Sequence, residues 1–230
     1  MVSPIYTIKV QCMMCEISFE TPRIRPSFKK TISKDSDFCG YYKDINPEYY
    51  VVRVCPFCGF STTENFGSSL TSDQKRTFHE KIGTNWTSKD YNITRTWEDA
   101  MQTYKLALVC AQIKKEKARV VAGILHHIAW LYREKELWED ENKFLTFAVQ
   151  AYIEVFETEP LNVNDVRVMY MIGELNRRLK NYSEAVNWFA RVVNDKRIMD
   201  AGMIKLSREQ WARTREDMLE DQVELPEELA

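Results

Sequence analysis

The stretch Tyr49-Tyr-Val-Val-Arg-Val-Cys-Pro-Phe-Cys-Gly59 decides the fold of the N-terminal part, because a strand-like run leads directly into a Cys-x-x-Cys pair. The same layout occurs in Ile5-Tyr-Thr-Ile-Lys-Val-Gln-Cys-Met-Met-Cys15. A strand followed by such a turn, twice in one chain, is typical of a zinc ribbon, in which four thiolates surround Zn²⁺ at about 2.3 Å. We therefore predict a structural Zn²⁺ ion bound by Cys12, Cys15, Cys55 and Cys58.

The two Cys-x-x-Cys turns differ in the residues that shape them. In the second turn, Pro56 presets φ, and Gly59 can adopt the positive φ that points backbone N–H groups at the sulfurs. The first turn has Met13 and Glu16 at these positions, so the sequence constrains its geometry less. A redox dithiol is the alternative, but such pairs usually open a helix, and no helical pattern follows either pair.

The composition of the 230 residues is that of a globular protein, with 44% hydrophobic and 12% aromatic residues. The net charge of −2 gives no overall attraction to nucleic acid or acidic lipid. The first residues lack the features of a signal peptide, and no apolar run reaches the roughly 20 residues of a membrane span. Because cysteine pairs without an export signal favour metal ligation, we expect a cytoplasmic protein with no membrane partner.

A basic segment lies between the two cysteine pairs. Arg23, Arg25, Lys29 and Lys30 alternate with apolar residues, as in some strands that bind single-stranded nucleic acid. Residues 1–65 nevertheless hold eight Lys and Arg against seven Asp and Glu. We therefore favour a solvated strand face and do not expect nucleic acid as the partner, although a nucleic-acid-associated zinc-ribbon protein is an alternative function.

The segment Asp35-Ser-Asp-Phe-Cys39 and the tyrosines after it have two interpretations. They either line a second site or form Asx-turns over a small core. Cys39 has no partner at a recognisable spacing, so we expect a small buried hydrophobic residue rather than a nucleophile. A thiol-based redox sensor or enzyme that uses Cys39 or unmetallated pairs is a further alternative function.

Three motifs together resemble those of a known bacterial family. The strings Asp35-Ser-Asp-Phe-Cys39, Asn46-Pro and Val54-Cys-Pro-x-Cys-Gly59 are similar to the signature of the family named domain of unknown function 2225. The resemblance covers nearly the whole chain, and it implies a bound zinc ion and tetratricopeptide-like helices after the cysteine-rich part. The first turn departs from the family pattern Cys-Pro-x-Cys-Gly. The resemblance implies no activity.

Helical periodicity with an internal repeat characterises the rest of the chain. Trp97-Glu-Asp-Ala100, Trp138-Glu-Asp-Glu141 and Tyr182-Ser-Glu-Ala185 recur at spacings of 41 and 44 residues. Gly173 and Phe189, on either side of the third copy, have the spacing of a tetratricopeptide (TPR) repeat, whose small residues let paired helices approach closely. The predicted helices span about 97–114, 118–135, 139–157, 165–179, 183–194 and 198–219.

These patterns predict an α+β fold that is mostly α, with a small β-rich zinc-ribbon-like module followed by a TPR-like array of helical hairpins. The predicted parts are the module over 1–65, a linker and connecting helix over 66–96 with Ser72 as N-cap, the array with a C-terminal capping helix over 97–220, and an acidic tail over 221–230. We expect Phe57 and Phe60 to dock the module on the helices. An ordinary helical bundle is the alternative to a repeat array.

In a repeat array, the first helix of each pair lines a concave surface that binds extended peptides. His126 and Arg133 are seven residues apart, as are Tyr170 and Arg177, so each pair lies on one helical face. Because this face is aromatic and basic, we expect an acidic peptide or the C-terminus of a partner protein as its ligand, with a plain solvated face as the alternative. The predicted groove comprises His126, Trp130, Arg133, Arg167, Tyr170, Glu174, Arg177 and Arg178.

The residues of this face do not belong to a known catalytic motif. The adjacent His126 and His127 point about 100° apart, so we expect one in the helix interface and the other toward the groove. The sequence has no Ser-His-Asp, His-Glu-x-x-His or phosphate-binding glycine pattern, so we name no catalytic residue. We therefore predict a zinc-binding, TPR-like scaffold for protein–protein interaction, with a protein or peptide partner of acidic character.

Overall fold

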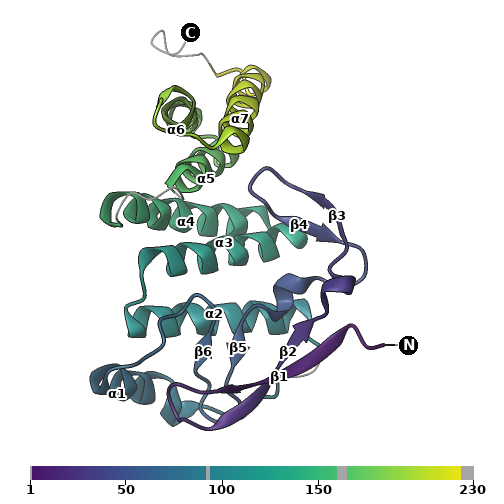
Figure 1. Cartoon of the computed structure of the whole chain (residues 1–230), viewed down its shortest axis with the longest axis vertical. Coiled ribbons are helices and arrows are strands. Elements are labelled where there is room, and N and C mark those ends of the chain that lie inside the picture. Colours follow the sequence, from purple (N-terminus) through teal and green to yellow (C-terminus); the bar gives the residue numbers. More distant parts are fainter. Residues whose placement is uncertain (1, 92–93, 160–164, 224–230) are drawn as a thin grey trace.

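The structure, a computed structural model, describes residues 2–91, 94–159 and 165–223 (Figure 1). Small antiparallel strand pairs occupy the N-terminal part, and seven α-helices follow within the described residues. This arrangement confirms the predicted α+β, mostly α class. In Figure 1 helices α2 to α5 lie one above another, α6 and α7 lie side by side above α5, the cysteine-bearing hairpins lie along α2, and the β3–β4 hairpin rises beside α3 and α4.

Two of the three small sheets carry the cysteine turns. β1 (Ile5–Gln11) pairs with β2 (Ser18–Ile24), and the first Cys-x-x-Cys turn joins them. β5 (Arg53–Val54) pairs with β6 (Ser61–Thr62) around the second turn. Each turn is therefore held at the end of an antiparallel hairpin.

The third sheet is the β3–β4 hairpin, formed by Thr31–Lys34 and Gly40–Tyr42. Its tip is the segment Asp35-Ser-Asp-Phe-Cys39, which we call the acidic turn. Phe38 has a positive φ of 69° in this turn. Phe38 N donates to Asp35 O at 2.9 Å, and Asp35 N donates to Cys39 O at 2.9 Å, so the backbone of the turn closes on itself.

The predicted strand before Cys55 is wrong in its first half. Residues Pro47–Tyr50 form a 3₁₀ helix, η2, and β5 begins only at Arg53. Asn46 caps η2 by accepting a hydrogen bond from Glu48 N at 3.0 Å, and a proline follows at the first helical position. This start signal outweighs the strand propensity of the tyrosines. Two further 3₁₀ helices are η1 (Pro26–Phe28) and η3 (Gly83–Asn85).

The predicted helices after residue 96 all form close to the expected bounds. The largest difference is at the last helix, which begins at Ala201 instead of 198. The connecting helix has Thr71 as its N-cap instead of Ser72, because Thr71 and Gln74 form a capping box. The helices are α1 (Ser72–Lys81), α2 (Trp97–Lys114), α3 (Ala118–Glu134), α4 (Trp138–Thr158), α5 (Asp165–Arg178), α6 (Tyr182–Asn194) and α7 (Ala201–Glu220).

The turns between paired helices share one backbone geometry. Lys115, Glu136 and Lys180 have φ values of 55°, 55° and 62°, and they follow α2, α3 and α5. In each turn the backbone N–H of the positive-φ residue donates to the carbonyl three residues earlier. The N–H of the following residue donates to the carbonyl five residues before it. This is the Schellman pattern, here without glycine. The same short turn therefore makes α2–α3, α3–α4 and α5–α6 helical hairpins.

The N-terminal part docks on α1, α2 and α3. Val52 and Val54 are fully or almost fully buried and belong to the core shared by α2 and α3. Phe60 packs edge-to-face on Phe78 of α1, with 5.0 Å between ring centroids. Phe57 is 57% exposed, so of the two predicted docking residues only Phe60 is buried in the contact.

Candidate metal centre and concave face

The four cysteines of the two Cys-x-x-Cys turns form one cluster. Their sulfur atoms all lie within 4.8 Å of one another. Cys12 Sγ is 3.6 Å from Cys58 Sγ, and Cys15 Sγ is 3.7 Å from Cys55 Sγ. A tetrahedral site with bonds of about 2.3 Å has sulfur–sulfur separations of about 3.8 Å, so the cluster has the size needed to hold a metal ion. Four sulfur ligands leave no open position for catalysis.

The first cysteine turn adopts the same backbone as the second despite its different residues. Glu16 N donates to Cys12 O at 2.8 Å, and Gly59 N donates to Cys55 O at 2.9 Å. Glu16 has a φ of 63°, close to the 77° of Gly59. A left-handed conformation costs a non-glycine residue roughly 1–2 kcal/mol. The glycine missing from the first turn is thus replaced by a strained glutamate in the same conformation.

Tertiary contacts fix the second turn from outside. Trp86 Nε1 donates to Pro56 O at 2.9 Å, and the Trp86 ring lies so close to Gly59 that a Cβ there would be 2.4 Å from it. On the other side, Ser61 N donates to the sulfur of Cys110 on α2 at 3.3 Å. The cluster is therefore anchored to the segment after α1 and to α2.

Helices α3 and α5 bring the predicted groove residues to one face, and the acidic turn covers that face. Asp37 is fully buried there. Arg133 donates to both carboxylate oxygens of Asp37 at 3.0 and 2.7 Å, and Trp130 Nε1 donates to one of them at 3.0 Å. His126 Nε2 lies 3.2 Å from the same carboxylate. Burial alone would raise the pKa of Asp37, but the hydrogen bonds from His126 and Arg133 hold it well below its usual range.

Arg133 is the centre of a buried ionic network. It also donates to Asp35 and to Glu141 of α4, each at 2.7 Å. Burial lowers the pKa of the guanidinium, but Asp37 and the other carboxylates raise it above its ordinary value. This residue is only 6% exposed and has three carboxylate partners, so the contact between the turn and α3 is buried and ionic.

Helix α5 holds the other half of the turn. Ser36 Oγ and Glu174 Oε1 lie 2.6 Å apart, and the Tyr170 hydroxyl donates to Ser36 O at 2.7 Å. The Phe38 ring packs on Tyr170, with 5.7 Å between centroids, and the Arg167 guanidinium lies 4.6 Å from the Phe38 centroid. Two arginines complete the contact: Arg177 and Arg178 each bond Glu174 and lie within 3.5 Å of Ser36 Oγ.

All eight predicted groove residues therefore contact the acidic turn of the same chain. The occupant is acidic, as we expect of a ligand for this face, but it comes from residues 35–39. A separate peptide can reach these side chains only if the turn leaves. The sequence contains the signal for this contact, since the acidic turn and the basic face have matching charges.

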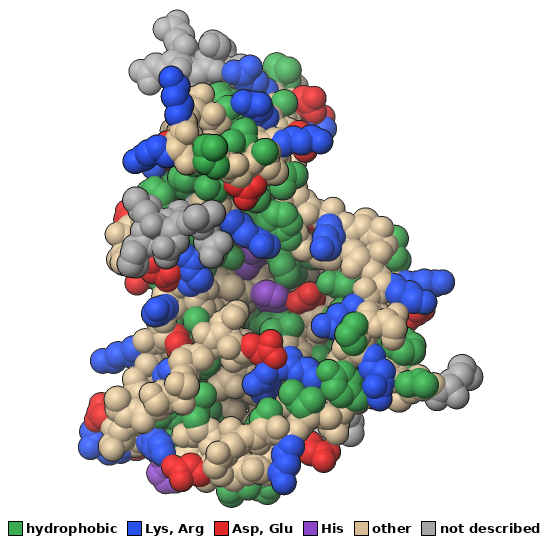
Figure 2. All heavy atoms as spheres, viewed as in Figure 1, with side chains coloured by type: hydrophobic (Ala, Val, Ile, Leu, Met, Phe, Trp, Pro, Cys, Tyr) green, Lys and Arg blue, Asp and Glu red, His purple; other side chains and the backbone are tan. Residues whose placement is uncertain are grey.

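The two adjacent histidines face different carboxylates. His126 faces Asp37 of the acidic turn, whereas His127 stacks on Tyr104 of α2 and lies 3.1 Å from Glu48. Burial lowers the pKa of His126, while for His127 the pairing with Glu48 outweighs burial and raises the pKa. His127 therefore lies in the interface with α2, whereas His126 is buried against the acidic turn. Figure 2 shows histidine side chains in a hollow near the middle of the visible face, beside acidic ones.

The residues that a thiol enzyme or a nucleic-acid-binding protein would use are mostly buried or paired within the protein. Cys39 is 7% exposed, and burial raises its pKa to about 12, as expected of a buried hydrophobic residue and not of a nucleophile. Arg23 pairs with Glu64 at 2.5 Å, and Arg25 lies over the Tyr6 ring at 5.1 Å. The basic segment is therefore partly neutralised.

The protein is therefore of the α+β class. Its two cysteine turns bring four sulfur atoms into a cluster that could bind a metal ion, and helical hairpins follow them. The chain matches the model of the family described as "uncharacterized protein conserved in bacteria (DUF2225)" over residues 5–214, and it belongs to this family. No curated protein matches the chain. Within the described residues, no helix has the length and apolar character needed to cross a membrane.

Proposed function

We propose that this protein is a zinc-stabilised scaffold for protein–protein interaction, in which a TPR-like helical array binds an acidic segment of its partner. One observation carries the proposal. The concave face of α3 and α5 holds the acidic turn through ionic, hydrogen-bonding and aromatic contacts, as a receptor face for an acidic segment would. In this proposal a partner segment of the same chemistry takes the place of the turn.

Zn²⁺ is the metal that this donor set favours. Four thiolates in tetrahedral arrangement are typical of structural zinc, and they suit magnesium, calcium or manganese poorly. The ion would hold the hairpins of the 1–65 module together, since each small sheet has only two strands. None of the six cysteines forms a disulfide, which supports a reducing, cytoplasmic location.

The helical hairpins support a TPR-like array over 97–220, with α7 as the capping helix, the linker over 66–96 before it and the acidic tail over 221–230 after it. A Cβ at Gly173 would lie 2.8 Å from the Phe189 ring, so α5 and α6 approach as closely as the repeat pattern expects. The three identical turns add to this regularity. Residues 224–230 of the tail lie outside the described residues.

The metal assignment is tested by elemental analysis and thiol titration of protein purified without chelator or added zinc. We expect one zinc per chain and four thiols that react only after a chelator is added. A Cys15→Ser variant should lose the zinc, while Cys39→Ser should retain it. Metal-free wild-type protein with six titratable thiols would contradict the proposal.

The receptor face is tested with a labelled peptide of residues 33–40 that carries Cys39→Ser. In fluorescence anisotropy, we expect this peptide to bind an Asp37→Ala protein, whose own turn is weakened, and not a protein with the matched control Asp44→Ala. The same peptide with Asp37→Asn should not bind. If the folded Asp37→Ala protein binds neither peptide, the face is an internal contact only and the scaffold proposal fails.

A further inference from the structure

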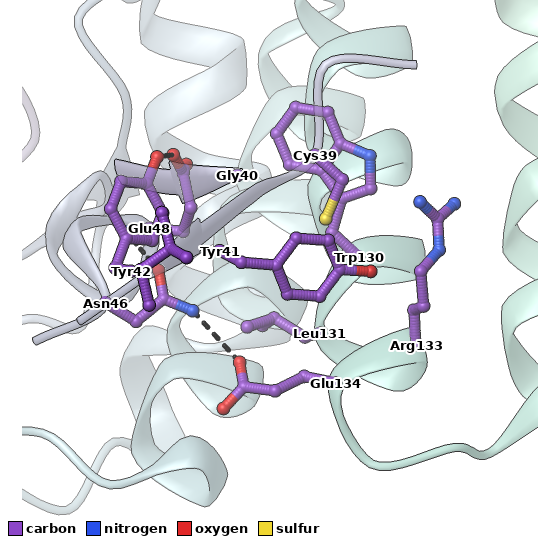
Figure 3. A pocket seen from close by; sticks show the side chains of 11 residues that line it. Cys39, Gly40, Tyr41, Tyr42, Asn46, Glu48, Trp130, Leu131, Arg133 and Glu134 are labelled. Carbon is purple, nitrogen blue, oxygen red and sulfur yellow. Dashed lines mark hydrogen bonds between the residues drawn. The ribbon is translucent and has the colours of Figure 1, made fainter. Parts of the chain in front are cut away.

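A cavity of about 320 Å³ lies between the β3–β4 hairpin, the start of η2 with its cap Asn46, and the second half of α3 (Figure 3). This volume is within the range of small-ligand sites. Tyr41 and Tyr42 of β4 and Trp130 of α3 give the cavity aromatic walls, and Glu48 and Glu134 contribute carboxylates. The cavity lies on the β4 side of the acidic turn, away from the contacts with α5.

Hydrogen bonds hold both carboxylates in fixed positions. Glu134 accepts from Asn46 Nδ2 at 2.9 Å, as Figure 3 shows, and also from the Tyr49 hydroxyl. Glu48 accepts from the Tyr42 hydroxyl at 3.1 Å on one oxygen. These are neutral donors, and a carboxylate has further lone pairs, so each can accept another hydrogen bond.

The cavity has an excess of negative charge. Arg133 lines it, but its guanidinium bonds to Asp35, Asp37 and Glu141 and extends away from Glu134 in Figure 3. Glu48 has His127 as its cationic partner. In the part of the chain that the structure describes, Glu134 forms no ion pair with a lysine or arginine. A cationic group is therefore the missing complement of this carboxylate.

We propose that this cavity binds a primary alkylammonium ion, either a free aliphatic amine or the end of a lysine side chain. The ammonium group donates to Glu134, and the alkyl chain packs on the rings of Tyr41 and Trp130, where the cation is also attracted by the aromatic faces. A quaternary ammonium lacks the N–H groups that the carboxylate accepts. The proposal depends on neither the metal nor an acidic partner.

The test is a titration of ¹⁵N-labelled full-length protein with n-butylammonium chloride at constant ionic strength. The indole N–H signal of Trp130, assigned with Trp130→Phe, reports binding. We expect a saturable shift, and Glu134→Gln should weaken binding roughly tenfold, as the loss of one charge-assisted hydrogen bond requires. The matched exposed variant Glu139→Gln should leave binding unchanged, and neutral 1-butanol should bind at least about tenfold more weakly.

A second variant, Tyr41→Leu, keeps the test valid if Glu134→Gln alters the fold, since Tyr41 is 40% exposed and removing its ring should weaken binding several-fold. Nα-Acetyl-lysine N-methylamide, whose side-chain ammonium group is free, distinguishes the two sources. Tighter binding than n-butylammonium identifies a lysine side chain, and weaker binding identifies a free amine. The proposal is overturned by the absence of a saturable shift, by equal binding of 1-butanol, or by unchanged affinity in both variants.

Discussion

Replacing Asp37 by asparagine should destabilise the whole protein by about 3 kcal/mol. The side chain keeps its shape but loses its charge, and its new N–H₂ group faces donors from Arg133, Trp130 and His126. Removing one partner of a buried ion pair costs about 3–5 kcal/mol, and the lower value applies because Arg133 retains two other carboxylates. Total stabilities are typically about 5–15 kcal/mol, so the loss is a large fraction.

Urea denaturation followed by circular dichroism measures this loss as a midpoint lowered by about 1–3 M, given slopes of about 1–3 kcal/mol per M. The exposed neighbour Asp44 provides the control, since Asp44→Asn should change stability by less than about 0.5 kcal/mol. Cys39 should also react faster with a thiol reagent in the Asp37 variant, because its 7% exposure depends on the docked turn.

The same variant has a distinct pH signature. The folded-state pKa of Asp37 lies well below its ordinary value of 3.8, so its ionised form stabilises the protein above that value. This contribution is lost as the pH falls from about 4 toward the folded-state pKa, and the gap between wild type and Asp37→Asn should narrow there. A destabilisation below about 1 kcal/mol at pH 7, or a gap that does not change in acid, would refute the reasoning.

Four further variants test other parts of the structure. Gly59→Ala should lower the urea midpoint and weaken metal retention, since its Cβ would lie 2.4 Å from Trp86 at a left-handed φ. Tyr170→Phe removes one buried hydrogen bond and should cost about 1 kcal/mol in the same assay. The pKa of His126 is lowered in the folded state, so its contribution to stability should be lost as the pH falls below 6.5. The pKa of His127 is raised, so its contribution should be lost as the pH rises above 6.5. The variants His126→Gln and His127→Gln should therefore change the pH dependence of stability in opposite directions. Identical curves for the two variants would contradict their assigned pKa directions.

Local sequence signals are strong enough to predict the helices and the cysteine cluster. Thr96 and Asp99 form a capping box that starts α2 at Trp97, and the cysteine spacing alone brings four sulfurs together. The positive φ values of Glu16 and Glu136 are not predictable in this way, because glycine is the usual signal for that conformation. Backbone hydrogen bonds within each turn accompany this conformation, from Glu16 N to Cys12 O and from Glu136 N to Arg133 O.

Local sequence signals do not predict the docking of the acidic turn, for a different reason. Asp37 meets Arg133 across 96 residues, and Ser36 meets Glu174 across 138. Contacts at such separations depend on how helices stack, which hydrophobic periodicity does not specify. The acidic turn and the basic residues of α3 and α5 are each visible in the sequence, but only their opposite charges indicate that they belong together.

These separations have a consequence for synthesis on the ribosome. At about 10 residues per second, Arg133 emerges roughly 10 s after Asp37, and Glu174 follows some 4 s later. The cysteine hairpins can close early, since all four cysteines lie within the first 58 residues. The aspartates of the turn, in contrast, remain hydrated until α3 and then α5 are made. Release of a truncated polypeptide before α5 would leave an anionic tip without the contacts that Tyr170, Glu174 and Arg177 supply.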